Sequence, residues 1–177
     1  MKRIVIASSG ASGADLSKKV IEKLPPTYEV HFIKTDNSDI VANKEQSIVL
    51  HENDDIAASI ASGSFKVDAM MIAPCSMNTL AKIACGIADN LPTRAASVMI
   101  KERRTLLLAP REMPFSAIAL ENMLKLSRLG VLIAPPVMAY YSKQTTLKEM
   151  EDFIIGKWFD LLGIENELYK RWEGEKI

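Results

Sequence analysis

Short apolar runs alternate with helical patterns along this 177-residue chain. Five runs have the length and composition of buried β-strands, namely 2–8, 28–34, 67–74, 105–110 and 131–136. The segments between them place apolar residues at helical spacing, and one of these, 76–86, begins at a Ser and ends at a Gly. Strands that alternate with helices over short connections favour a parallel sheet with right-handed crossovers. We therefore expect an α/β protein with a doubly wound, mostly parallel sheet in a three-layer, Rossmann-like arrangement.

The length and composition of the chain fit one cytoplasmic domain. No linker, repeat or low-complexity tract divides it, so we expect a single domain over 1–177. Lys and Arg together number 22, as do Asp and Glu, so no basic excess points to nucleic acid. No run reaches the roughly 18 apolar residues of a membrane span, and the first run is too short for a secretion signal. Cys75 and Cys85 form no CxxC motif, which favours reduced thiols in the cytoplasm.

A glycine-rich turn, SSGASG at 8–13, follows the first strand. A strand that runs through such a turn into a helix presents backbone N–H groups to an anion. Gly10 and Gly13 allow the tight turn, and Ser12 adds a hydroxyl. The third glycine of GxGxxG is missing, and Thr35 follows the second strand where an acidic residue would be needed, so NAD is disfavoured and a mononucleotide is favoured. The alternative interpretation is an ordinary tight βα turn.

Polar residues follow the third and fourth predicted strands. Ser76, Asn78 and Thr79 lie at the start of a predicted helix, where their side chains either cap the helix or bind a ligand. Capping needs only one of them, so the three together favour a site. Arg111 and Glu112 come directly after the fourth strand. Because the carboxyl ends of parallel strands meet at one edge of a sheet, we expect both sets to line one crevice for a phosphorylated small molecule.

A second set of cations lies on and after the predicted helix 89–102. Arg94 and Lys101 are seven residues apart, about two helical turns, so the two side chains can point to the same side. Arg103 and Arg104 are interpreted as part of a solvated helix face.

No pattern in the chain indicates a metal site or a catalytic thiol. His31 lies inside the second strand and His51 in a polar loop, 51–64, and no HExxH motif or Cys/His cluster exists. Cys75 has no histidine near it in the sequence, and a buried thiol is commonly inert. We therefore expect no metal and no thiol chemistry.

Across nearly its whole length the sequence resembles the flavin prenyltransferases, the UbiX-type enzymes. The most specific shared segments are SGASG from Ser9, PCSMNTLAKIACGIADNL from Pro74, RAASV from Arg94, KERR from Lys101, PRE from Pro110 and LENMLKLS from Leu120. The resemblance implies a flavodoxin-like fold, FMN as the bound nucleotide, and a homododecamer with sites at the subunit interfaces.

The resemblance also implies a reaction. These enzymes transfer the dimethylallyl group of dimethylallyl phosphate to N5 and C6 of reduced FMN, without a metal ion. The prenylated FMN then serves UbiD-type decarboxylases in ubiquinone-like and aromatic-acid pathways. The residue types leave open whether the donor is a monophosphate or a diphosphate.

Site residues follow from the resemblance by position. FMN binding falls to Gly10, Ala11, Ser12, Thr35, Ser76, Met77, Asn78, Thr79, Arg94 and Arg111. Binding of the donor falls to Tyr141, Lys157, Arg94 and Lys101. Catalytic roles fall to Ser12, Glu45, Lys101 and Glu112. Cations and a tyrosine hydroxyl would stabilise the departing phosphate, and a carboxylate near N5 would accept the proton lost as the second bond forms.

The chain departs from the family pattern at a few positions. Asp15 adds a negative charge near the phosphate site, and Lys157 stands where Arg is frequent, which keeps the charge but loses the bidentate fork. Two other functions compete with prenyl transfer. One is an FMN-dependent decarboxylase of cysteine-type substrates, but the chain has PCSMNT where those enzymes have a PASANT-like loop, and it has no PxMN segment. The other is a non-catalytic FMN-binding subunit, which would not require Glu45, Lys101 and Glu112 together.

Overall fold

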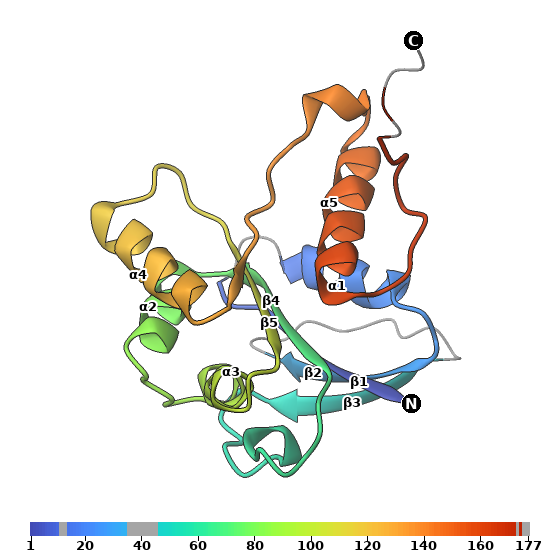
Figure 1. Cartoon of the computed structure of the whole chain (residues 1–177). Coiled ribbons are helices and arrows are strands. Elements are labelled where there is room, and N and C mark those ends of the chain that lie inside the picture. The colour runs from blue at the N-terminus through green and yellow to red at the C-terminus, as the bar shows by residue number, and fades with distance from the viewer. Residues whose placement is uncertain (11–13, 35–45, 173, 175–177) are drawn as a thin grey trace. The chain divides into compact units, whose positions relative to one another are not determined.

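The computed structural model describes residues 1–10, 14–34, 46–172 and 174 (Figure 1). The chain forms two compact units, 1–135 and 136–177. The first unit carries the sheet, and the second carries one long helix. No helix within the described ranges combines the length and the apolar character needed to cross a membrane.

The first unit is built on a sheet of six strands, counted over the described residues, and all of them are parallel. The strands are β1 (Lys2–Ala7), β2 (Tyr28–Lys34), β3 (Ser47–Glu52), β4 (Ala69–Cys75), β5 (Thr105–Pro110) and β6 (Leu132–Ile133). Their spatial order is β3-β2-β1-β4-β5-β6, so the direction of winding reverses between β1 and β4. In an open parallel sheet this reversal leaves a crevice at the carboxyl ends of the two central strands.

Side-chain caps start three of the helices described in the first unit. They are α1 (Ala14–Lys23), the short η1 (Ser59–Ala61), α2 (Met77–Ala84), α3 (Leu91–Lys101) and α4 (Ala117–Arg128). The hydroxyls of Ser76 and Ser116 each accept a hydrogen bond from the N–H three residues on, at the starts of α2 and α4. Asn90 and Thr93 form a capping box at the start of α3.

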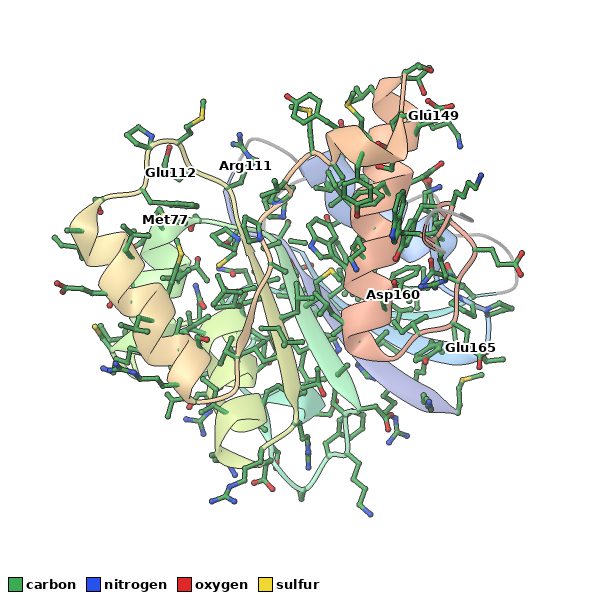
Figure 2. The ribbon with its side chains drawn as sticks, turned by 45° about the horizontal axis from the view of Figure 1, so that its top comes forward. Met77, Arg111, Glu112, Glu149, Asp160 and Glu165 are labelled. Carbon is green, nitrogen blue, oxygen red and sulfur yellow. The ribbon has the colours of Figure 1, made fainter. Side chains whose placement is uncertain are left out.

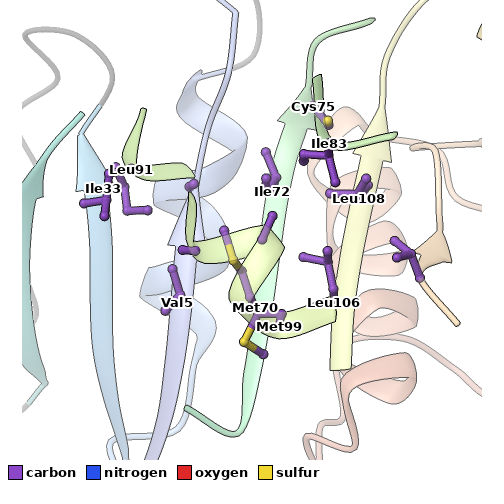
Figure 3. Close-up of a cluster of buried hydrophobic side chains, with 14 of the residues drawn as sticks. Val5, Ile33, Met70, Ile72, Cys75, Ile83, Leu91, Met99, Leu106 and Leu108 are labelled. Carbon is purple, nitrogen blue, oxygen red and sulfur yellow. The ribbon is translucent and has the colours of Figure 1, made fainter. Parts of the chain in front are cut away.

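The central strands of the sheet are buried on both faces, as their continuous apolar runs predict. Val5, Ile72 and Leu108 join residues of α2 and α3 in one hydrophobic cluster (Figure 3). Ile4 and Met71 are equally buried and point to the opposite face, because successive side chains of a strand alternate. Figure 1 shows α1 on that side of the sheet and α2 and α3 on the other. The three-layer, doubly wound arrangement is confirmed.

The structure corrects the predicted strands at the two edges of the sheet. β3 was not predicted, and its last residues were interpreted as the beginning of a loop. Val49 and Leu50 are 38% and 59% exposed, so this edge strand lacks the buried apolar run that identifies the central strands. The run 131–136 contributes only the two residues of β6. The segment 38–45, whose sequence predicts the beginning of a helix, lies outside the described residues.

The second unit consists of η2 (Tyr140–Ser142), α5 (Leu147–Leu162) and the segment that follows. Thr146 and Glu149 form a capping box at the start of α5. Gly163 ends the helix with φ of 68°, a left-handed conformation that glycine adopts without steric cost.

Candidate functional site

A cavity of about 270 Å³ opens at the carboxyl edge of the sheet, where β1, β4 and β5 end. Its lining consists of Ser9, Gly10, Pro74, Cys75, Ser76, Met77, Arg111 and Glu112. Figure 2 shows the labelled side chains of Met77, Arg111 and Glu112 at this edge, above the ends of the strands. The cavity therefore occupies the crevice that the reversal of strand order creates.

Hydrogen bonds between β1 and β4 fix the floor of the cavity. The backbone N–H of Ser9 donates to the carbonyl of Pro74 over 2.9 Å. The Ser9 hydroxyl in turn accepts from the backbone N–H of Ser76, also over 2.9 Å. Ser9, two residues after the end of β1, thus holds the turn between β4 and α2 in place.

Gly10 brings the loop after β1 close to the start of α2. Its φ is 103°, which a residue with a side chain rarely adopts. A Cβ at this position would lie 3.6 Å from the Cβ of Ser76. The need for glycine predicted at Gly10 is confirmed, whereas Gly13 lies outside the described residues.

The three polar side chains at the start of α2 divide their roles. Ser76 caps the helix by accepting from the N–H of Thr79 over 3.2 Å, and its hydroxyl donates to the Thr79 hydroxyl over 3.1 Å. Thr79 is buried and Asn78 is exposed. Capping therefore accounts for two of the three residues, and of these three side chains that of Asn78 is the one turned to solvent.

Arg111 and Glu112 bring opposite charges to the rim of the cavity. Both are exposed and directly follow β5. One oxygen of Glu112, Oε1, accepts from the backbone N–H of Met113 over 3.1 Å, which holds the carboxylate beside its own backbone. The second oxygen, Oε2, takes no part in that bond.

Cys75 lines the cavity but is not equipped as a nucleophile. It is 1% exposed, and burial raises the pKa of its thiol to about 12. A thiol with that pKa is protonated at neutral pH, and the thiolate is the nucleophile. The expectation of an inert Cys75 agrees with its surroundings.

Nearly the whole chain matches known flavoproteins. The sequence profile of the family named Flavoprotein matches residues 1–158. A flavin prenyltransferase UbiX of Helicobacter pylori is 50% identical over 183 residues, which cover 96% of this chain and 98% of that protein.

Solved structures agree. A dodecameric FMN-dependent UbiX-like decarboxylase of Escherichia coli O157:H7 is 37% identical, with a TM-score of 0.89, and the match covers 97% of this chain and 100% of that one. AnUbiX (PadA1), in complex with FMN and dimethylallyl pyrophosphate, is 37% identical with a TM-score of 0.90, over 99% of both chains. The chain belongs to the flavoprotein family and, within it, to the UbiX-type flavin prenyltransferases. Cysteine decarboxylases of known structure match at 21% identity, which shows the shared fold alone.

The cavity of this UbiX-type chain fits a phosphorylated flavin. The first N–H groups of α2 have no partner inside the helix, and its N-terminal dipole favours an anion. Arg111 adds a positive charge beside them. The close approach of Gly10 leaves the backbone of the loop, without a side chain, facing the same space.

Two predicted site residues on α3, Arg94 and Lys101, do not line this cavity within one chain. The N–H of Leu91 donates to the carbonyl of Asn53, which follows β3, so α3 begins near the carboxyl edge of the sheet. Arg94, in its first turn, is exposed and does not line the cavity. Lys101 ends the helix shortly before β5 begins, which places it at the amino edge of the sheet. Within one chain, Lys101 therefore lies at the opposite edge of the sheet from the cavity, whereas Arg94 lies nearer the edge where the cavity opens.

The remaining predicted site residues fall into two groups. Tyr141 and Lys157 lie in the second unit, Tyr141 in η2 and Lys157 on α5, and both are exposed. The ring of Tyr141 packs edge-on against Phe153, 6.0 Å between centroids. Ala11, Ser12, Thr35 and Glu45 lie outside the described residues.

Sequence reasoning missed several features. Ser9 was not singled out, although a second hydroxyl directly after a strand was visible in the sequence. Arg104 is not part of a solvated face, because it donates to the carbonyls of Gly63 and Phe65. His51, predicted to lie in a polar loop, belongs to β3 and is hydrogen-bonded to His31. Within the described ranges no three metal-ligating side chains gather.

Proposed function

We propose that the protein transfers a dimethylallyl group from dimethylallyl phosphate to N5 and C6 of reduced FMN. The cavity at the carboxyl edge of the sheet carries the proposal, because it joins a helix N-terminus, an arginine and a carboxylate. The 50% identity to a flavin prenyltransferase over nearly the full length of both chains supports the same activity. A relative that is 37% identical binds FMN together with dimethylallyl pyrophosphate, so both donors are to be tested.

The residues around the cavity would hold the flavin. Gly10 and the start of α2, with Ser76 and Met77, would face its phosphate and ring, and Arg111 would offer its guanidinium at the rim. Asn78 and Thr79 lie in the same first turn of α2 and would also contact FMN. Arg94, in the first turn of α3, is a further proposed FMN ligand. Ala11, Ser12 and Thr35 complete the proposed FMN contacts by family resemblance alone.

Cationic side chains of the protein would bind the phosphate of the prenyl donor. Reduced FMN, when bound, would supply an electron-rich ring as acceptor of the allylic group, so no covalent enzyme nucleophile would be needed. Arg94, Lys101, Tyr141 and Lys157 would bind the phosphate and stabilise its negative charge as it leaves. Because three of these four are cations, the charge can be balanced without a metal ion.

Two carboxylates, those of Glu112 and Glu45, would take part in proton transfer. Glu112 lines the cavity, and its Oε1 is fixed by the Met113 N–H. Glu45, with the hydroxyl of Ser12, is assigned to the proton lost from the ring when the second bond forms. Buried Cys75 takes no part, because its thiol is protonated.

Assembly and partners extend the proposal. A UbiX-like relative is dodecameric, and we propose that this chain also forms a homododecamer with its sites at subunit interfaces. Lys101, at the amino edge of its own sheet, would then serve the site of another copy. We further propose that 1–177 acts as one domain in the cytoplasm, and that its product serves UbiD-type decarboxylases.

The direct test is anaerobic incubation of the protein with dithionite-reduced FMN and either dimethylallyl phosphate or dimethylallyl pyrophosphate, followed by mass spectrometry of the released flavin. We expect a gain of one C5 prenyl unit that depends on the protein and is lost in Glu45→Gln and Glu112→Gln. Unmodified FMN with both donors, from protein that binds FMN, would overturn the proposal in favour of a decarboxylase or an FMN carrier.

A further inference from the structure

A turn of fixed backbone geometry follows the end of α3. The N–H of Arg104 donates to the carbonyl of Met99 over 2.9 Å, and Arg103 adopts a left-handed φ of 54°. This geometry closes the helix and turns the chain back towards β5. The four residues KERR, from Lys101 to Arg104, therefore have a fixed backbone.

The Arg104 side chain binds this turn to the segment that precedes β4. Its guanidinium donates to the carbonyl of Gly63 over 2.7 Å and to that of Phe65 over 2.9 Å. The side chain is only 18% exposed. Because the planar guanidinium donates to two backbone carbonyls, the positive charge of Arg104 is held in one position.

Glu102 links this fixed charge to Lys101. One carboxylate oxygen pairs with the ammonium of Lys101, and the other lies 3.9 Å from the Arg104 guanidinium. The Lys101 ammonium lowers the pKa of the Glu102 carboxyl, so the carboxylate is ionised at neutral pH. Lys101 itself stays 58% exposed, which leaves its ammonium open to a second anion.

Gly63 makes the room for this ion pair. A Cβ on Gly63 would lie 2.7 Å from Nζ of Lys101 and closer still to Oε1 of Glu102. Its backbone carries no φ in the left-handed range, so alanine can adopt the same conformation. Alanine at position 63 would thus displace the two charged groups without removing a charge or straining the backbone.

A lysine ammonium on a four-carbon stem loses much rotamer freedom when it binds an anion. A carboxylate and a backbone-bound arginine that hold the ammonium beforehand reduce that loss. We propose that Glu102, Arg104 and Gly63 form a seat that positions Lys101 for the phosphate of the prenyl donor. This inference rests on the proposed function, in which Lys101 binds the donor, and it names three positioning residues that touch neither donor nor flavin.

The test is a set of double-mutant cycles in the full-length protein. The donor KM and kcat are measured for the wild type, Gly63→Ala and Glu102→Gln, each with and without Lys101→Ala. We expect each seat variant to raise the donor KM about tenfold with little change in kcat or FMN affinity, since a misplacement of about 1 Å can cost up to 10²-fold. In the Lys101→Ala background the same changes should add no more than about twofold.

Two controls complete the design. Asp89→Asn removes a carboxylate from the exposed Lys82–Asp89 pair, which lies 2.7 Å apart, and should leave the donor KM unchanged. Glu102→Asp keeps the charge and should recover part of the loss. An unchanged donor KM in Gly63→Ala and Glu102→Gln, or an equal rise when Lys101 is already alanine, would overturn the seat.

A readout without turnover separates this inference from the proposed function. Acetic anhydride labelling, followed by mass spectrometry, reports how firmly each lysine amine is held. We expect Gly63→Ala and Glu102→Gln to raise the labelling rate of Lys101 several-fold and to leave Lys82 unchanged. If the wild type forms no prenylated flavin, the proposed function fails, and the labelling alone then decides whether the seat exists.

Discussion

The Nδ1 atom of His31 lies 2.8 Å from Nε2 of His51, and the two rings stack with centroids 5.2 Å apart. On its other side, Nε2 of His31 lies 2.9 Å from Oε1 of Glu29. Because an ionised carboxylate only accepts, a neutral His31 keeps its proton on Nε2 and accepts from Nε2–H of His51 through Nδ1. The chain of hydrogen bonds is therefore complete when both imidazoles are neutral.

We predict that the protein loses stability as the pH falls below about 6.5. Burial lowers the pKa of both histidines, against the attraction of Glu29 for His31 and of Asp55 for His51, while Arg3 adds to the lowering at His31. The unfolded chain then binds more protons than the folded one. The stability is complete above the unfolded pKa and is lost towards the lowered values, by up to about 1.4 kcal/mol per pH unit for each proton. Urea unfolding between about pH 5 and 8 measures the slope.

His51→Gln is the matched variant, because a glutamine amide can still donate to Nδ1 of His31 and does not titrate. Its stability should depend less steeply on pH over the same range. A slope equal to that of the wild type would mean that other groups cause the acid sensitivity.

Asp160 fastens the chain after α5, and we predict that Asp160→Asn loosens it. The carboxylate accepts from Nη2 and Nη1 of Arg171, at 2.8 and 3.0 Å, from the Tyr169 hydroxyl and from the Asn166 amide. Bonds from Arg171 above all lower the pKa of Asp160 to about 2. The folded pKa lies below the usual 3.8, so this contribution is present above pH 3.8 and is lost as the pH falls through about 2.

The loss expected from Asp160→Asn is about 1–2 kcal/mol, since Arg171 is half exposed and solvent weakens its share. Hydrogen exchange over 164–172 should accelerate in this variant. Asp89→Asn, which removes the partner of Lys82 in the first unit, is the control, and it should leave exchange over 164–172 unchanged. Unaltered exchange in Asp160→Asn would contradict the prediction.

The central strands could be predicted because burial on both faces makes them continuously apolar. β3 could not, since an edge strand with exposed Val49 and Leu50 lacks that pattern. The pairing of His31 with His51 depends on β3, so it was hidden for the same reason. A missed edge strand thus concealed a hydrogen-bonded titratable pair, of which His31 is buried.

The site, like the sheet, was predictable from the sequence in part. Ser76, Arg111 and Glu112 were predictable because residues directly after parallel strands meet at one edge. Lys101 was not, since the 11 residues of α3 span about 16 Å and carry it towards the opposite edge. Ser9 acts through a bond to a residue 67 positions away, which no local pattern reveals.

Cys75 and Cys85 should differ sharply in reactivity. Burial raises the pKa of Cys75 to about 12, while Cys85 is exposed. We predict that iodoacetamide at neutral pH labels Cys85 and spares Cys75, as read by peptide mass spectrometry. Prenyl transfer should survive Cys75→Ser. Loss of turnover with intact FMN binding in that variant would instead assign the thiol a role in the reaction.

Ser76 and Ser116 form a matched pair of helix caps. Each hydroxyl accepts from the N–H three residues on over 3.2 Å, but only Ser76 lines the cavity. Replacing either by alanine should lower the free energy of unfolding by about 1 kcal/mol. Only Ser76→Ala should also weaken FMN binding, because it removes a hydroxyl from the cavity wall and leaves the first turn of α2 less fixed.

Urea unfolding and titration of FMN fluorescence measure the two effects separately. If Ser116→Ala weakened FMN as much as Ser76→Ala, the loss would reflect general destabilisation of the first unit. If neither variant affected FMN, the start of α2 would not contact the flavin. A weakening confined to Ser76→Ala, at equal cost in stability, locates the flavin at the junction of β4 and α2.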